Sequence, residues 1–189
     1  MSVNLSKGQK VSLTKDNPGL DELFAGLGWD INRCSGSDFD LDATAMLLRG
    51  GKMKHKKRDI VYFGNLTHES GAVVHTGDNL TGAGEGDDEV INISLSRIPA
   101  DVDKIVIAVN IYQAHRRKQD FGMVDNAFIR LCDRKTGKEL YRYDLSGSSA
   151  GMTAMIFAEV YRHGSEWKFG IIGQGTDDGT ITDMAKRYA

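Results

Sequence analysis

Cysteine and proline are scarce in this sequence, and each occurs only twice among its 189 residues. The two cysteines, Cys34 and Cys132, lie far apart along the chain and make no Cys-x-x-Cys pair. A site built on paired thiols is therefore not indicated. We expect two ordinary reduced thiols, with a disulfide between them as the minor alternative.

Long apolar segments are also missing. No uninterrupted run of about 18 apolar residues occurs, which is the length that a membrane-spanning helix needs, and the N-terminus lacks the apolar core of a signal peptide. The net charge of -2 is too small to indicate a nucleic-acid or membrane partner by itself. We therefore expect a soluble cytoplasmic protein.

The length of the chain predicts one domain, residues 1–189. A domain of this size buries about 70% of the surface that its unfolded chain exposes, so it forms a core without a disulfide or a metal. Neither a linker-like segment nor a repeat of fixed period divides the sequence. A metal bound by this chain would therefore have a functional or a local structural role.

Short segments rich in β-branched and aromatic residues, separated by turn residues, predict strands along almost the whole chain. The segments are 3–5, 11–13, 24–29, 41–48, 60–63, 90–95, 104–112, 127–132, 140–145, 155–161 and 167–173. About ten strands at this spacing predict an all-β fold, a β-sandwich of two sheets. Thr136-Gly137 is a predicted hairpin turn, and residues 180–188 predict a short C-terminal helix. Residues 152–162 could form a helix instead of a strand.

The segment 105–109, Ile-Val-Ile-Ala-Val, is apolar at every position, whereas an outer strand of a simple sandwich alternates between apolar and polar residues. Its second face must therefore be covered. A buried central position in the fold is the first explanation, and a loop, the C-terminal helix or another subunit could provide the cover. We expect a monomer or a weak homo-oligomer.

Residues 77–89 read Gly-Asp-Asn-Leu-Thr-Gly-Ala-Gly-Glu-Gly-Asp-Asp-Glu and contain no lysine or arginine. The segment carries five carboxylates, Asp78, Glu85, Asp87, Asp88 and Glu89. Two carboxylates about 4 Å apart repel by roughly 1 kcal/mol in water and by about 4 kcal/mol at an effective dielectric of 20. A folded loop with several such pairs needs a counter-ion, and its glycines let the backbone turn carbonyl groups toward one.

Oxygen ligands without nearby thiolates or imidazole pairs suit Ca²⁺ or Mg²⁺ rather than zinc or copper. A flexible loop rich in ligands favours Ca²⁺, which tolerates irregular geometry. The loop is not an EF-hand, because Leu80 and Gly82 stand at the third and fifth positions counted from Asp78. A solvated acidic loop without a ligand is the alternative.

A second acidic segment strengthens the metal hypothesis. Residues 38–43, Asp-Phe-Asp-Leu-Asp-Ala, alternate so that Asp38, Asp40 and Asp42 would share one face of a strand. Residues on the same face are about 6.7 Å apart, so Asp40 and Asp42 could share one ion or serve two adjacent ions. A strand whose acidic face simply meets solvent is the alternative.

Residues 52–58 form a basic run with Lys52, Lys54, His55, Lys56, Lys57 and Arg58. Such a run could contact phosphate groups of nucleic acid or lipid, but it has no interleaved aromatic residue for base stacking. We expect a solvated hairpin tip. Residues 115–118, His-Arg-Arg-Lys, are a second basic cluster, and a phosphate-binding patch would require the fold to bring the two clusters together.

A set of short segments occurs in a fixed order over nearly the whole chain: 3–8 (Val-Asn-Leu-Ser-Lys-Gly), 26–30 (Gly-Leu-Gly-Trp-Asp), 39–43, 71–73 (Gly-Ala-Val), 75–79 (His-Thr-Gly-Asp-Asn), the acidic loop, 118–124, 126–130, 161–169 and 173–175. Taken in this order, the segments resemble the TerD-type tellurium-resistance family. The resemblance implies a β-sandwich that binds two Ca²⁺ ions through its central loop in bacterial tellurite-resistance and stress-response systems. The basic run departs from the typical member.

The resemblance also implies which residues bind metal. Asp30, Asp40 and Asp42 match the acidic positions on the strand side, and the loop side is matched by Asp78, Asn79, Asp87, Asp88 and Glu89. Glu85 is included although the family varies at that position, and Asp38 has no secure counterpart. The implied partners are other stress-response proteins of the Ter type, with a membrane-associated complex as a further option.

Two enzyme hypotheses compete with a binding module. Carboxylates with a divalent metal also describe phosphohydrolases, for which His75 would be the candidate base, but a lone histidine before a turn is more often structural. Direct reduction of tellurite would need a dithiol, a flavin or a redox metal, which the sequence does not indicate. We therefore expect a Ca²⁺-binding sensor or scaffold without enzymatic activity. Binding of a cyclic nucleotide, described for similar domains, is the alternative.

Overall fold

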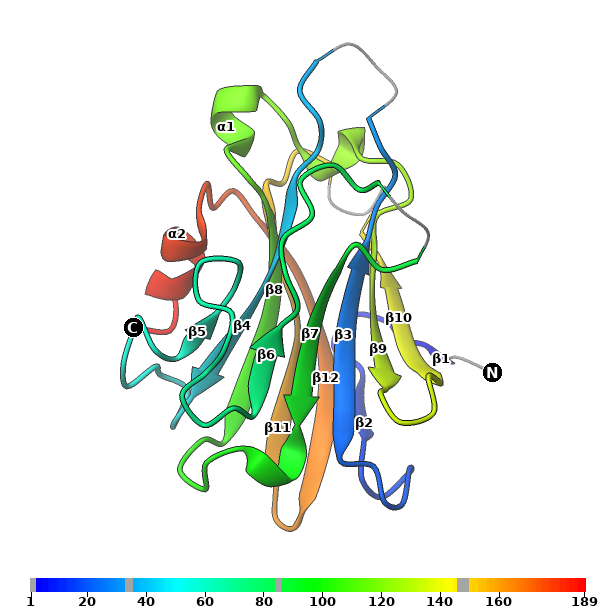
Figure 1. The fold of residues 1–189 in the computed structure, drawn as a ribbon, viewed down its shortest axis with the longest axis vertical. Helices are drawn as coiled ribbons and strands as arrows, with labels where there is room; N and C mark the ends of the chain where they lie inside the picture. Colours follow the sequence, from blue (N-terminus) through cyan, green and yellow to red (C-terminus); the bar gives the residue numbers. More distant parts are fainter. Residues whose placement is uncertain (1–2, 33–35, 84–85, 146–149) are drawn as a thin grey trace.

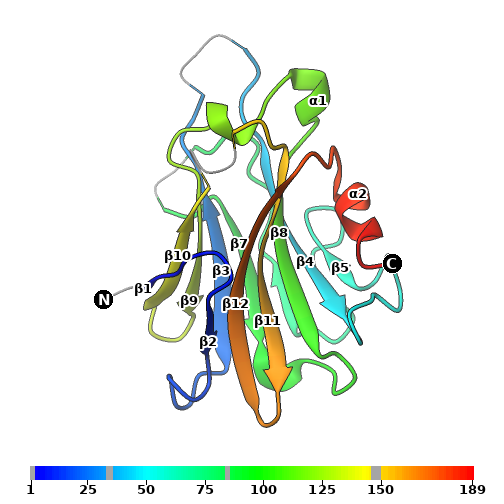
Figure 2. The same ribbon diagram turned by 180° about the vertical axis from the view of Figure 1, so that it is seen from behind.

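The computed structural model describes residues 3–32, 36–83, 86–145 and 150–189. Within these ranges the chain forms twelve strands, which are arranged as two six-stranded sheets packed face to face (Figures 1 and 2). The structure thus confirms the predicted β-sandwich with a short C-terminal helix. No helix among the described residues is long and apolar enough to cross a membrane.

The first sheet has the strand order β1 (Val3–Asn4), β10 (Glu139–Asp144), β9 (Phe128–Asp133), β3 (Glu22–Gly28), β7 (Glu89–Ser94) and β6 (Val73–His75). The second has the order β2 (Lys10–Ser12), β12 (Glu166–Thr176), β11 (Ala154–His163), β8 (Lys104–Ile111), β4 (Leu41–Leu48) and β5 (Ile60–Val61). The pair β1–β10 is parallel and the other pairs are antiparallel. Short helices follow β7, β8 and β12: η1 (Leu95–Arg97), α1 (Ala114–Arg117), η2 (Phe121–Met123) and α2 (Ile181–Lys186).

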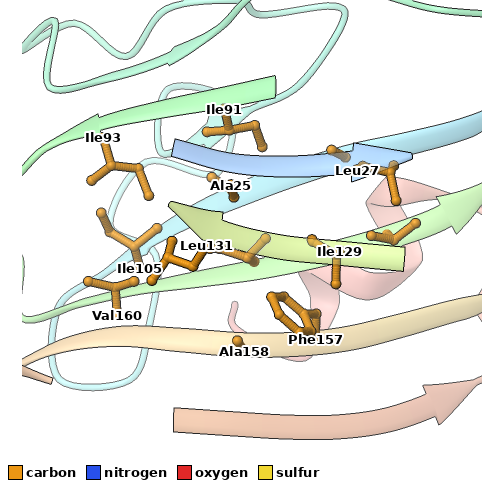
Figure 3. Close-up of a cluster of buried hydrophobic side chains, with 14 of the residues drawn as sticks. Ala25, Leu27, Ile91, Ile93, Ile105, Ile129, Leu131, Phe157, Ala158 and Val160 are labelled. Carbon is orange, nitrogen blue, oxygen red and sulfur yellow. The ribbon is translucent and has the colours of Figure 1, made fainter. Parts of the chain in front are cut away.

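Apolar side chains from both sheets form one shared core. Figure 3 shows Ile91, Ile129 and Leu131 of the first sheet in one cluster with Phe157 and Val160 of the second, and all five are buried. Alternate residues of each strand enter this layer because side chains alternate between the faces of a sheet. The core holds the two sheets together and fixes the loops at their ends.

A second, smaller cluster explains the strand that is apolar on both faces. β8 lies between β11 and β4, and its outward residues Val106 and Ala108 pack against Met184 and Ala185 of α2. The central position and the helical cover were both among the expected explanations. The side chain of Thr180 caps this helix by accepting a hydrogen bond from the backbone N–H of Asp183.

Several predicted elements differ from the observed ones. The strand predicted across Asp38 and Asp40 is wrong, because β4 begins only at Leu41 and is buried on both faces. The predicted strand 155–161 is confirmed as part of β11 (Ala154–His163), so the alternative of a helix over 152–162 is wrong. β6 was not predicted at all. The turn at Thr136-Gly137 is confirmed, since it joins the antiparallel strands β9 and β10 with Gly137 at a φ of +70°.

The basic run lies in the connection between the antiparallel strands β4 and β5, as a hairpin tip should. Lys52, Lys54, Lys56 and Lys57 are exposed. Asp59 closes the hairpin from inside by accepting hydrogen bonds from the backbone N–H of His55 and from the Arg49 side chain. Burial opposes ionisation of Asp59, but these donors outweigh it and hold the pKa of the carboxyl below its usual value.

Candidate metal centre

Three of the predicted carboxylates meet at one end of the sandwich, where the connections 29–40 and 76–88 leave the sheets (Figure 1). One oxygen from each of Asp40, Asp42 and Asp78 lies within 4.8 Å of the other two. Asp42 is the second residue of β4, Asp40 immediately precedes that strand, and Asp78 follows β6. The cluster therefore joins segments that belong to opposite sheets.

The buried member of this cluster is Asp42, whose residue surface is only 2% exposed. Burial, followed by the negative charges of Glu89 and Asp40, raises the pKa of Asp42 to about 8. Burial also raises the pKa of Asp40 despite the nearby Arg117, whose Nη1 lies 3.5 Å from Asp40 Oδ2. One positive side chain thus compensates only part of the acidic charge.

Asn110 of β8 is a residue of this centre that the sequence did not reveal. Its Nδ2 donates a 3.0 Å hydrogen bond to Asp42 Oδ2, and the residue is 2% exposed. Its Oδ1 is buried and has no hydrogen-bond partner among the described atoms. A buried acceptor without a donor is costly, so this oxygen beside the carboxylates is suited to receive a cation, a water molecule or a ligand donor.

Glu89 links the two sheets beside the cluster. Although it begins β7 of the first sheet, its Oε2 accepts a 2.7 Å hydrogen bond from the backbone N–H of Ala43 in the second. This N–H is available because β5 pairs with β4 only at Ala45 and Met46. Burial raises the pKa of Glu89, opposed by its hydrogen bonds. The hydrogen bond to Ala43 therefore makes the Glu89 carboxylate a link between the two sheets.

His75 lies against Glu89, with Nε2 3.3 Å from Glu89 Oε2, and its side chain is fully buried. Its Nδ1 accepts a hydrogen bond from the backbone N–H of Gly77. Both ring nitrogens are thus engaged within the fold. This environment supports the structural role expected for His75 and leaves it without access to a substrate.

Asp88 and Asn79 hold the loop in place. Asp88 Oδ2 accepts from the backbone N–H of Trp29 at 2.9 Å, and Asp88 Oδ1 accepts from Asn79 Nδ2 at 2.9 Å. Asn79 Oδ1 in turn accepts from the backbone N–H groups of Thr81 and Gly82. Burial, then the charges of Asp87 and Asp30, raises the pKa of Asp88 against the Trp29 hydrogen bond. The loop is therefore shaped by its own polar side chains.

Two predicted ligands have protein partners of their own. Asp87 accepts two hydrogen bonds from Arg130, at 2.8 Å from Nε and 2.9 Å from Nη2. Asp30 Oδ2 accepts from Asn126 Nδ2 at 2.7 Å. The bidentate pair neutralises Asp87 without a metal, which gives this carboxylate a smaller need for a cation than Asp42 has.

Glu85 lies outside the described residues, and Asp38 is exposed and is not part of the carboxylate cluster. Of the nine predicted ligands, the structure thus brings Asp40, Asp42 and Asp78 together. The charge of Glu89 contributes to the raised pKa of Asp42, and the charge of Asp30 contributes to the raised pKa of Asp88. The roles of all nine as ligands stay predictions.

Arg117 and Arg130 were also missed by sequence reasoning, although each contacts an acidic residue of this end. Arg130 lies between the apolar residues Ile129 and Leu131 of its strand, a pattern that does not identify its partner. Asn110 interrupts an apolar strand, and a polar residue at a buried strand position was a usable signal. Only the register Asp42↔Asn110 between β4 and β8 makes its partner evident.

The donor set fits a hard cation. The three clustered side chains and the unpartnered Asn110 oxygen supply oxygen atoms only, and Ca²⁺ and Mg²⁺ bind oxygen ligands. The sole thiol within the described residues, Cys132, is buried, and burial raises its pKa to about 11. Soft-metal ligation or thiolate chemistry has no support from that residue.

Comparison with known proteins places these features in a family. The TerD domain model of that family matches residues 1–188. The chain is 48% identical to stress response protein SCP2 of Bacillus subtilis (strain 168), with all of both chains covered. It is also 48% identical to tellurium resistance protein TerD of Serratia marcescens, covering 98% of this chain and 97% of that one.

A solved structure shows the same fold at lower similarity. It is a crystal structure of a homologue of the telluride resistance protein TerD from Streptomyces coelicolor A3(2), with a TM-score of 0.73 and 22% identity over 87% of this chain and 98% of that chain. At this identity the likeness concerns the fold. The sequence relatives and the family match together show that this chain belongs to the TerD domain family.

Proposed function

We propose that this protein is a Ca²⁺-binding, non-enzymatic module of a cytoplasmic system for tellurite resistance and general stress response. The names of its relatives in Bacillus subtilis and Serratia marcescens support the cellular role. The observation that carries the molecular role is the meeting of Asp40, Asp42 and Asp78 with oxygens within 4.8 Å of one another. Asp42 is nearly inaccessible to solvent, which cannot screen its charge well.

A bound Ca²⁺ would supply the positive charge that the cluster lacks. Asp40, Asp42 and Asp78 would hold it, and Asn110 Oδ1 is a further candidate donor. Because Asp78 comes from the loop whereas Asp42 belongs to β4, such an ion would fasten the loop 76–88 to the second sheet. Ion binding would therefore order the loop at this end of the sandwich and reduce its negative charge.

The proposal includes a second ion, for which Asp30 and Asp88 with Asn79 are the candidate ligands. The charge of Asp30 contributes to the raised pKa of Asp88, so these two carboxylates repel each other. A cation between them would relieve that repulsion. Glu89 remains a candidate ligand of the first ion through its coupling to Asp42.

A sensor or scaffold agrees with these features better than a catalyst does. His75 is buried and bonded within the fold, so it would not serve as the general base of a phosphohydrolase. Cys132 is buried with its pKa raised, so it would not reduce tellurite directly. We propose that the metal-ordered end is presented to other stress-response proteins of the Ter type.

Calorimetric titration of metal-stripped protein with Ca²⁺ tests the proposal. We expect up to two sites, with the site at the cluster lost in Asp42→Asn and retained in Asp38→Asn, the matched control for an exposed aspartate of the same segment. Mg²⁺ as competitor measures the selectivity between the two ions. No heat and no rise in thermal stability with Ca²⁺ would refute the metal-binding function.

A further inference from the structure

A large cavity lies beside the metal centre, between the β4–β5 hairpin, the end of β8 and helix α2. Its volume is about 930 Å³, within the range of small-molecule sites. Asp42 and Asn110 line its inner part, Ile60 and Ala185 belong to the apolar cluster beneath α2, and Lys56 stands on the hairpin side. The proposed Ca²⁺ function uses Asp42 and Asn110 on the wall of this cavity but none of its other lining residues.

Three aromatic rings give the cavity its shape. Phe63 lies edge-to-face with Tyr62, at a centroid distance of 5.1 Å, and with Tyr112, at 6.2 Å. All three residues line the cavity and none of them is buried. Partly exposed rings that surround a hollow can stack on the flat face of a ligand, because such contacts remove apolar surface from water.

Lysines supply positive charge at one side of the same cavity. Lys56 and Lys57 of the hairpin tip line it, and no ion pair of either lysine occurs in the part of the chain that the structure describes. Lys186 also lines it, although its Nζ lies 2.7 Å from Asp183 Oδ1. The residues 115–118 do not line the cavity, so only the first basic cluster contributes.

The inner part offers buried polar groups. Asn110 is 2% exposed and its Oδ1 lacks a hydrogen-bond partner among the described atoms, while its Nδ2 is already bonded to Asp42. A ligand N–H or O–H that reaches this oxygen would remove the cost of the unpaired acceptor. Asp42 and the hairpin lysines line the same cavity, and an anionic group is attracted to the lysines rather than to the carboxyl of Asp42.

We propose that this cavity is a binding site for a small organic anion that carries an aromatic ring. The rings of Tyr62, Phe63 and Tyr112 contact the planar part, and Lys56 and Lys57 contact the anionic group. A ligand that carries ring and charge in one molecule can contact both sets of residues, because the aromatic and basic residues lie on the wall of the same cavity. The ligand site does not require the metal.

Calorimetric titration of the full chain with 1-naphthyl phosphate tests this assignment, with 1-naphthol and inorganic phosphate as probes that carry only the ring or only the charge. We expect saturable binding of 1-naphthyl phosphate at least about tenfold tighter than that of either partial probe. Displacement by adenosine 5′-monophosphate or by 1-naphthoate then distinguishes a nucleotide from an aromatic carboxylate as the source of this chemistry.

Two variants locate the site. The double substitution Lys56→Ala and Lys57→Ala should weaken binding about three- to tenfold, as expected for two exposed charge contacts. Lys52→Ala with Lys54→Ala is the matched control, because these exposed lysines of the same hairpin do not line the cavity. Phe63→Ala should weaken binding about tenfold, with thermal unfolding confirming that the variant is folded.

The proposal is overturned if 1-naphthyl phosphate does not bind saturably. It is also overturned if binding is equal in the wild type, in Phe63→Ala and in the Lys56/Lys57 double variant. Because the titration is carried out with metal-stripped protein and repeated with Ca²⁺, a failure of the metal site leaves the result for this cavity readable.

Discussion

The stability of the metal-free protein should fall as pH rises from about 5.5 to 8, and Asp42 should be a main cause. The carboxyl of Asp42 ionises near pH 3.8 in the unfolded chain and near pH 8 in the fold. Between these values the unfolded state binds fewer protons, so raising the pH favours unfolding. The stability contributed by the proton on Asp42 is fully present below pH 3.8 and is lost as pH rises through about 8.

The magnitude follows from the displacement of the pKa. At about 1.36 kcal/mol per pKa unit, a pKa near 8 removes roughly 3 kcal/mol of unfolding free energy between pH 5.5 and 8. Urea unfolding of metal-stripped protein at several pH values measures this change. Asp42→Asn keeps an acceptor for Asn110 Nδ2 and removes the titrating group, so its stability should depend less on pH than that of the wild type.

Asp38→Asn is the control for this experiment, since Asp38 is exposed and lies outside the cluster. Its unfolding free energy should follow the wild-type pH dependence. If the unfolding free energies of Asp42→Asn and the wild type depend equally on pH, the pKa of Asp42 is not raised in the fold and the reasoning is refuted. Added Ca²⁺ should stabilise the wild type more at pH 8 than at pH 5.5, because it binds the ionised form.

Three further predictions concern the surroundings of the centre. Arg130→Ala should lower the unfolding free energy by about 1–3 kcal/mol in urea, because it leaves Asp87, whose side chain is only 8% exposed, without its bidentate partner. A neutral effect would refute that role. Gly82→Ala should weaken Ca²⁺ binding about tenfold or more in calorimetry. The reason is that Gly82 has a φ of +70° and that a Cβ there would lie 2.5 Å from Trp29 Nε1. Gly50→Ala is the control for backbone strain alone, because Gly50 has a φ of +60° and open space around it. Met184→Ala should cost about 2–5 kcal/mol by opening a void under α2 while the number of Ca²⁺ ions bound is unchanged, and loss of Ca²⁺ binding would show that α2 supports the metal centre.

Much of the fold could be predicted because strands leave a local signal in the sequence. Short segments of β-branched and aromatic residues marked eleven strands, and their spacing identified the sandwich. β6, Val73–His75, was missed, although β2 is equally short and was predicted. The alternation of Asp38, Asp40 and Asp42 did not mark a strand with a solvent-facing acidic side. Asp38 is exposed in the connection before β4, whereas Asp40 and Asp42 are buried where that strand begins.

The site was predictable in composition but not in pairing. The many acidic residues identified both segments, 38–43 and 77–89, as candidate parts of a site. The resemblance to the family indicated that the two segments belong to the same site. Which carboxylate meets which partner depends on sheet register and on loop conformation. Arg130 lies in β9, beside β3, and reaches Asp87 of the loop, whereas Asn110 reaches Asp42 only because β8 pairs with β4. Such long-range pairs have no signature in a single sequence.

A crystal structure of the Ca²⁺-loaded protein tests the central claim most directly. We predict an ion coordinated by carboxylate oxygens of Asp40, Asp42 and Asp78 at about 2.3–2.6 Å. Protein crystallised at saturating Ca²⁺ in which these three carboxylates contact no ion would contradict the account.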